Sequence, residues 1–245
     1  MQAQTTTKRS SLPGALFIGV ITAGAAAVLG YSVLDGSFRQ PAYAAALLLM
    51  ALLTARMKVT LPGMNGNMSV NLPFILVAVT QLSVLEALAV ALPSIAVQCL
   101  PKGGGKPKAA QMLFNLSTTV LAVELGSWVA RQVSTPGDDW TSASVLLLLT
   151  GISFLFVQTL PVAAILTLTE GGKMPLVWSR IFLLSFPYYL LSVGVTSLMN
   201  TASQHMGWEV PLLALPVMYG VYRAYNLYFG RLMKVNAQRT AVGAS

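Results

Sequence analysis

The sequence predicts an all-α protein, a polytopic bundle of membrane-spanning helices with both termini in the cytoplasm. Three observations lead to this fold class. Hydrophobic residues make up 55% of the 245 positions and charged residues only 9%, against about 25% charged residues in a typical soluble domain. Long apolar runs alternate with short polar segments. The basic residues, 15 against seven acidic ones, lie between these runs, as expected for cytoplasmic loops.

Composition also excludes several classes of protein. A disordered chain needs low hydrophobicity and high charge, and this chain has the opposite composition. A disulfide scaffold or a Cys/His zinc site needs more ligands than one Cys99 and one His205. Nucleic-acid binders cluster Lys and Arg on a solvated face, which is not the pattern here. We therefore expect no metal, no cofactor and no nucleic-acid partner.

We predict a polar cytoplasmic N-terminus at 1–13, a single transmembrane domain at 14–229 and a basic cytoplasmic tail at 230–245. About six full transmembrane helices are expected, at 14–34, 41–55, 109–131, 141–168, 175–199 and 209–229. The first run has 21 residues, longer than the apolar core of about 7–15 in a signal peptide, so we expect a retained helix. Its small residues Gly19, Gly24 and Ala25–Ala27 predict the close approach of a neighbouring helix. Pro, Gly and Asn at 59–68 predict a loop with tight turns.

The apolar stretch at 69–100 is the least regular part of this domain. As a single helix it would be about 46 Å long, against a hydrocarbon core of about 30 Å. Its most polar part, Gln81–Glu86, lies in the middle. Three arrangements fit this pattern: one strongly tilted helix, two full crossings, or a re-entrant pair screened from lipid by other helices.

The distribution of charge favours a broken helix or helical hairpin at 69–100. If the basic N-terminus is cytoplasmic, a single crossing would place seven later Lys and Arg residues of the loops and tail outside. A hairpin returns all seven to the cytoplasm, in agreement with the positive-inside rule. The outer side then holds only Arg39 and Arg131, beside several acidic residues.

Polar residues within or beside the apolar runs are the candidate site residues, because burying them in lipid is costly. The candidates for ligand binding or for a polar core are Asn65, Asn67, Ser69, Gln81, Glu86, Asn115, Thr118, Glu124 and Arg180. Helical spacing brings Asn115, Thr118 or Thr119, and Ala122 near one face. This face is expected to meet protein or a cavity rather than lipid. Polar atoms that also need partners belong to Gln98, Gln158 and Asn200.

No catalytic set is recognisable in the sequence. Nucleophilic catalysis usually needs Ser or Cys beside a base, and the only histidine, His205, falls in a predicted outer loop. The only pair of adjacent aspartates, Asp138-Asp139, has no other acid near it in the sequence. We therefore predict that the chain is not an enzyme. The alternative left open is a lipid-processing site formed by Glu124 and Arg180.

Residues 40–130 follow a familiar order. A polar loop precedes a Ser-initiated apolar segment from Ser69, a break, a second apolar segment to Leu100, a basic loop, and a helix that opens with Phe114-Asn115. This order resembles the N-terminal membrane regions of some bacterial HD-GYP and GGDEF signalling proteins. The chain ends at Ser245, soon after the last predicted helix, so we expect no output domain and no cyclic-dinucleotide chemistry. The resemblance implies a module of a bacterial inner membrane that senses, binds or scaffolds.

The broken segment at 69–100 and the loop at 59–68 are also similar to substrate-binding subunits of energy-coupling-factor transporters. Those subunits are small and helical, and they hold vitamins or metals between helices and loops. Broken helices mark binding sites in transporters. This second resemblance is weaker than the first, and it implies a role in the uptake of a small solute.

Three functions remain. The first, which we favour, is a non-catalytic membrane module, sensor-like or an accessory subunit, that binds a small ligand or a partner membrane protein. The second is a transport component for a small solute, with the path near Asn67, Ser69, Gln81, Asn115 and Glu124. The third is an accessory subunit of a larger complex, for which the small-residue face at 19–27 is suited. The expected partners are the lipid bilayer, another membrane protein or a second copy of the chain, and a small-molecule ligand.

Overall fold

A computed structural model describes residues 12–60, 67–101, 109–133, 140–206 and 210–242. Within these ranges the chain forms eight helices and two short strands. In chain order they are α1 (Leu12–Asp35), α2 (Pro41–Ala55), β1 (Lys58–Thr60), β2 (Asn67–Ser69), α3 (Leu72–Gln81), α4 (Val84–Cys99), α5 (Ala109–Val133), α6 (Trp140–Glu170), α7 (Met174–Met206) and α8 (Val210–Val242). The predicted all-α fold is confirmed.

Four of the described helices, α1, α5, α6 and α7, are long and apolar enough to cross a membrane. The prediction of a helical membrane bundle agrees with this finding. Two helices that were predicted as full spans are not among the four. With 15 residues, α2 is only about 23 Å long, which is short for a hydrocarbon core of about 30 Å. In α8, tyrosines, Arg223 and Asn226 interrupt the apolar sequence.

Two elements depart from the predicted boundaries. The segment at 59–68, expected to be a loop only, contains an antiparallel ladder in which Lys58, Val59 and Thr60 pair with Ser69, Met68 and Asn67. Two of the three residues in β1 are β-branched, which favours a strand. The last helix continues to Val242, beyond the predicted end at 229, since the predicted tail up to Val242 contains no proline and no glycine after Gly230.

The segment at 69–100 is a helical hairpin. α3 ends at Gln81, α4 begins at Val84, and Leu82 and Ser83 between them are both extended. Asn71, before the start of α3, donates a 3.3 Å hydrogen bond to Ser94, late in α4, so the two helices run antiparallel. A single tilted helix is therefore excluded. The eight residues from Leu72 to Val79 are all buried, which screens α3 from any lipid.

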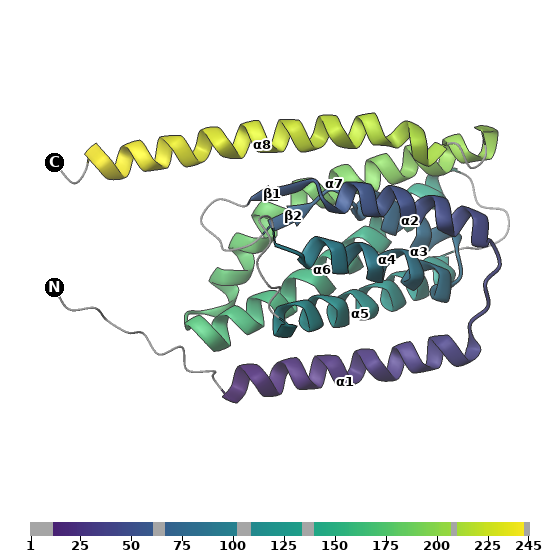
Figure 1. Cartoon of the computed structure of the whole chain (residues 1–245), viewed down its shortest axis with the longest axis horizontal. Coiled ribbons are helices and arrows are strands. Elements are labelled where there is room, and N and C mark those ends of the chain that lie inside the picture. Colours follow the sequence, from purple (N-terminus) through teal and green to yellow (C-terminus); the bar gives the residue numbers. More distant parts are fainter. Residues whose placement is uncertain (1–11, 61–66, 102–108, 134–139, 207–209, 243–245) are drawn as a thin grey trace.

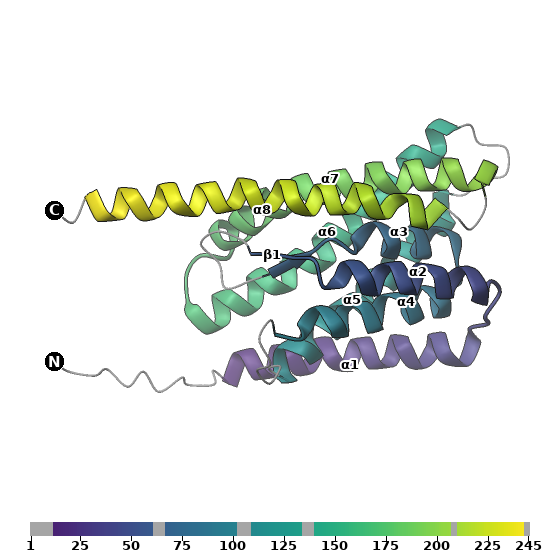
Figure 2. The same ribbon diagram turned by 45° about the horizontal axis from the view of Figure 1, so that its top comes forward.

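The hairpin helix α3 forms the centre of the bundle, where α2, α4, α5, α6 and α7 all contact it. The largest fully buried side chains belong to this core and include Phe74, Leu76, Leu47, Leu88 and Phe154. α1 packs mainly against α5. On the opposite side of the molecule, α8 lies against α2, α7 and β1, as Figures 1 and 2 show.

The helices share one long axis and alternate in direction, so the bundle has two distinct ends (Figure 1). We name one the basic end, where α1, α3, α5 and α7 begin and where Arg56, Lys58, Lys173 and Arg180 lie. The other is the tip end, formed by the 36–40 loop and the turn between α3 and α4. α8 also finishes at the basic end, on the opposite side of the bundle from α1. The turn from α6 to α7 uses Gly171 and Gly172 at φ of 82° and 109°, which side chains disfavour.

Only part of the small-residue face of α1 packs against the described part of the chain. Ala25 is buried, and α1 meets α5 through it and through the Phe17–Phe114 ring contact. Gly19 and Gly24 have open space where a Cβ would be. The predicted close approach at these two glycines is therefore wrong within this chain. The physical reason is helical periodicity, because the buried or half-buried positions 17, 21, 25 and 28 face the bundle and leave the glycines on the outer side.

Candidate functional site

The nine predicted site residues do not form a single site. Gln81 and Glu86 lie at the tip end, whereas Ser69, Asn115 and Thr118 lie toward the basic end. Glu124 faces α1, and Arg180 is exposed on α7. Asn67 pairs with Thr60 in the strand ladder, and its side chain is outside the described structure. Asn65 lies outside the described residues.

At the tip end, Glu86 is fully buried and its carboxylate meets three donors. These are the backbone N–H of Gln40, the backbone N–H of Ser83 at 3.0 Å and the Ser83 hydroxyl at 2.9 Å. Ser83 in turn caps α4 by accepting a hydrogen bond from the Glu86 N–H, which completes a capping box. The carboxylate therefore joins the start of α4 to the start of α2.

The same turn also contacts the 36–40 loop. The Ser83 hydroxyl lies 2.8 Å from the carbonyl oxygen of Ser37. A Cβ on Gly36 would lie 2.2 Å from the carbonyl oxygen of Ser32 and 2.9 Å from the Cβ of Leu85, so this close approach requires glycine. The network around Glu86 thus fastens the hairpin to the loop after α1, which is a structural role.

Two further candidates also bind neighbouring helices. The Gln81 side-chain amide donates a hydrogen bond to Asn200 on α7, so two residues that were predicted to need partners satisfy each other. Glu124 accepts a 3.4 Å hydrogen bond from Ser32 on α1 and lies 3.9 Å from the guanidinium of Arg131. Arg180 lies near the start of α7, toward the other end, so Glu124 and Arg180 do not face each other. The lipid-processing site left open as an alternative is not assembled.

A cavity of about 190 Å³ lies among β2, α3, α4, α5, α6 and α7. Its polar lining residues are Ser69, Asn71, Gln98, Thr119, Gln158, Thr159, Ser185, Tyr188 and Tyr189. Its apolar lining residues are Leu72, Ile75, Ile95, Phe154, Val162 and Ile181. Among these described lining residues none is Asp, Glu, Lys, Arg or His, so the described lining is partly polar and carries no charge.

One wall of the cavity is fixed by Tyr188. Its buried hydroxyl donates a 2.8 Å hydrogen bond to the carbonyl oxygen of Ser69 and accepts one of 3.2 Å from the N–H of Leu72. The Ser69 hydroxyl donates to the amide oxygen of Asn71 at 2.7 Å. These bonds satisfy backbone groups at the start of α3, where a helix leaves N–H groups unpaired. They hold β2 and α3 against α7.

The opposite wall is fixed by side-chain bonds between α5, α6 and α7. The Gln158 amide donates to the Thr119 hydroxyl at 3.2 Å, and that hydroxyl donates to the carbonyl oxygen of Asn115 at 2.7 Å. The indole N–H of Trp178 donates to the Thr159 hydroxyl at 3.2 Å. The predicted polar face of α5 thus meets protein and a cavity, as expected.

One buried polar group at the cavity is not satisfied in this way. The amide oxygen Oε1 of Gln98 is buried and has no hydrogen-bond partner in the described structure. Burying an unpaired polar group costs about 1–3 kcal/mol. Gln98 lines the cavity, so a ligand whose N–H or O–H donor reaches this buried oxygen would satisfy it.

Of the predicted site residues whose side chains the structure describes, only Ser69 lines this cavity. Asn115 contributes indirectly, through its carbonyl bond to Thr119, and its amide contacts Cys99 Sγ at 3.4 Å. Thr118 is buried but donates to the Asn115 carbonyl at 3.1 Å and does not line the cavity. The lining residues missed as site candidates include Asn71, Gln98, Thr119, Gln158, Thr159, Ser185, Tyr188 and Tyr189. The sequence feature that could have indicated the cavity was a glutamine within each of two apolar runs, Gln98 and Gln158.

The fold and the cavity define a helical membrane bundle with an uncharged polar cavity near its basic end. Among the described residues, no group of three or more His, Cys, Asp or Glu is placed to hold a metal ion. The chain matches no protein-family model, no curated protein and no solved structure. The resemblances to signalling membrane regions and to transporter subunits therefore stay predictions.

Proposed function

We propose that this protein is a non-catalytic membrane module that binds a small, uncharged ligand in the cavity around Gln98. The observation that carries the proposal is the buried, unpartnered Gln98 Oε1 on a cavity whose other polar groups are mostly held in place by the chain itself. Buried polar groups in proteins are nearly always hydrogen-bonded. An unpaired acceptor at a preformed cavity supports a ligand that supplies the donor.

The chemistry of the lining restricts the ligand class. A charged group would enter a cavity whose described lining residues offer no opposite charge, and burying an unpaired charge is very unfavourable. An apolar cavity of about 150 Å³ holds benzene, so about 190 Å³ accommodates a slightly larger compound. Phe154 and Ile95 provide apolar contact for its ring or chain, and Gln98 Oε1 accepts its donor.

The proposal is tested with benzamide, which is uncharged and carries N–H donors, and with benzoate, which has the same ring but a negative charge. We expect benzamide to bind the protein in lipid nanodiscs above the level of empty nanodiscs, and benzoate not to bind. Gln98→Leu removes the acceptor and should weaken benzamide binding about five- to tenfold, the equivalent of one hydrogen bond of about 1 kcal/mol.

The matched control is Gln111→Leu. Gln111 is exposed on α5 and does not line the cavity, so this variant should bind benzamide as the parent protein does. Equal binding of benzamide and benzoate would overturn the proposal. Unchanged binding after Gln98→Leu would overturn it too.

The proposed location is a bacterial inner membrane, with the basic end and both termini in the cytoplasm. The helix ends and connecting sequences at the basic end contain twelve of the 15 Lys and Arg residues and one of the seven acidic residues. The tip end contains two basic and six acidic residues. This asymmetry supports the cytoplasmic orientation. It also supports α2 and α8 as further crossings, because each connects the two ends.

Association with a partner membrane protein is a second candidate function. The observation that favours it is the open outer face of α1, where a Cβ added at Gly19 or Gly24 would have nothing within 4 Å of it. Small residues on such a face let another transmembrane helix approach closely. Transport of a small solute stays an alternative use of the cavity, and of the four residues along its predicted path whose side chains are described, only Ser69 lines that cavity.

A further inference from the structure

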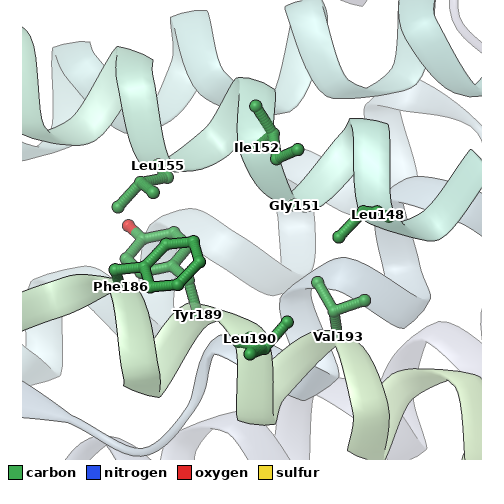
Figure 3. A pocket seen from close by; sticks show the side chains of 8 residues that line it. All are labelled: Leu148, Gly151, Ile152, Leu155, Phe186, Tyr189, Leu190 and Val193. Carbon is green, nitrogen blue, oxygen red and sulfur yellow. The ribbon is translucent and has the colours of Figure 1, made fainter. Parts of the chain in front are cut away.

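A shallow apolar groove runs along the outer face between α6 and α7 (Figure 3). Its volume is about 20 Å³, against about 190 Å³ for the cavity, so an occupant would lie along it rather than inside it. Leu148, Ile152, Phe186 and Leu190 line the groove and are all exposed. Because α6 and α7 are both long and apolar enough to cross a membrane, this groove is open to the acyl chains of the bilayer.

Tyr189 lines both the groove and the polar cavity. Its neighbours on α7 alternate between the two sites, with Ser185 and Tyr188 at the cavity and Phe186 and Leu190 at the groove. Figure 3 shows the Tyr189 ring beside Phe186, with its hydroxyl directed toward Leu155 on α6. The groove and the cavity therefore adjoin each other at the Tyr189 side chain.

We propose that the ligand of the cavity is an uncharged amphiphile drawn from the bilayer. Its hydroxyl- or amide-bearing headgroup lies in the cavity and donates to Gln98 Oε1, and its apolar chain passes Tyr189 and lies in the α6–α7 groove. This inference rests on the proposed function and specifies its ligand. The cavity offers polar surface for the headgroup, and the groove offers apolar surface for the chain. The two surfaces adjoin each other at Tyr189.

The orientation of Tyr189 agrees with this arrangement. The side chain stands between the polar and the apolar site. A headgroup at the boundary can hydrogen-bond to its hydroxyl. A tyrosine, which has an apolar ring and a polar tip, is suited to a position between an apolar and a polar environment.

The test uses 1-monooleoylglycerol, whose headgroup is uncharged and carries two hydroxyls, and oleate, which has the same chain with a carboxylate. Both are measured in nanodiscs, with benzamide as a third probe that needs only the cavity. Leu190→Trp fills the groove from an exposed position. Its matched control is Leu191→Trp, since Leu191 is also exposed, lies next to Leu190 on α7 and lines neither site.

We expect monooleoylglycerol to bind more tightly than oleate and to displace benzamide. Leu190→Trp should weaken monooleoylglycerol binding at least tenfold and leave benzamide binding unchanged, and Leu191→Trp should change neither. If benzamide binds but monooleoylglycerol does not displace it, or if the two Trp variants bind monooleoylglycerol equally, the amphiphile is excluded while the cavity keeps its proposed function. If neither benzamide nor monooleoylglycerol binds the parent protein, both proposals fail.

Discussion

The tip end and the cavity differ in how a buried polar side chain is hydrogen-bonded. At the tip, the Glu86 carboxylate is fully buried, and donors from Gln40 and Ser83 surround it. At the cavity, Gln98 Oε1 is also buried, yet no described group donates to it. Both residues interrupt an apolar sequence, and both were conspicuous for that reason. The pattern of their hydrogen bonds separates the two residues.

The difference shows how to distinguish a structural polar residue from a binding residue in a membrane bundle. A polar group whose hydrogen-bond partners all come from the chain is already satisfied, and a ligand would have to displace those partners. A polar group that lacks a partner and borders a cavity is incomplete, so a ligand can improve its free energy. In this protein the buried charge of Glu86 is fully paired within the chain, whereas the neutral Gln98 Oε1 has no partner among the described residues.

The largest expected effect is the labelling of the two ends from opposite sides of the membrane. In a Cys99→Ser background, single cysteines replace the exposed Ser37 at the tip end and the exposed Lys173 at the basic end. An impermeant thiol reagent applied to intact cells should label the Ser37→Cys protein and spare the Lys173→Cys protein. Permeabilised cells, in which both label, provide the control. Labelling of Lys173→Cys alone would invert the proposed topology, and labelling of both in intact cells would mean that the bundle axis does not cross the membrane.

Glu86→Leu should cause the next largest effect, a loss of stability. The substitution leaves the N–H groups of Gln40 and Ser83, whose bonds to Glu86 are partly buried, without their acceptor, and an unsatisfied buried group costs about 1–3 kcal/mol. We expect the free energy of unfolding in mixed micelles to fall by about 3 kcal/mol. Glu124→Leu is the control, because Glu124 is partly exposed and its contact with Arg131 is long, so that substitution should cost less than about 1 kcal/mol. Equal losses in the two variants would contradict a special role for the Glu86 network.

Much of the fold was predictable because it depends on local sequence. The predicted helix at 41–55 matches α2 residue for residue, and the polar interruption at Gln81–Glu86 marked the hairpin turn. The role of Glu86 was also open to prediction, since Ser83 and Glu86 have the Ser-x-x-Glu spacing of a capping box. The open glycine face of α1 was not predictable, because the sequence does not show which side of a helix finds a neighbour.

The cavity was less predictable because its residues come from six elements. Ser69 and Tyr188, which share a hydrogen bond, are 119 residues apart, and no spacing rule joins them. Tyr189 gave no signal of its own, as aromatic residues are frequent throughout the last two helices. Gln98 and Gln158 were noticed only as polar atoms in need of partners. Which of the two finds one is decided by packing, since Gln158 reaches Thr119 and Gln98 Oε1 reaches no described donor.

Gln98→Leu should change the free energy of unfolding least of all, and this small change tests directly whether Gln98 differs from the fully hydrogen-bonded Glu86. Removing a buried acceptor that has no partner should leave the free energy of unfolding unchanged or raise it by up to about 1 kcal/mol. Gln158→Leu is the matched substitution at the same cavity, and it should lower that free energy by about 1 kcal/mol because the bond to Thr119 is lost. Saturating benzamide should then stabilise the parent protein more than the Gln98→Leu variant, since a ligand stabilises more strongly the more tightly it binds. A loss of stability in Gln98→Leu as large as that in Gln158→Leu would show that Gln98 is already satisfied, and the distinction between the tip end and the cavity would fail.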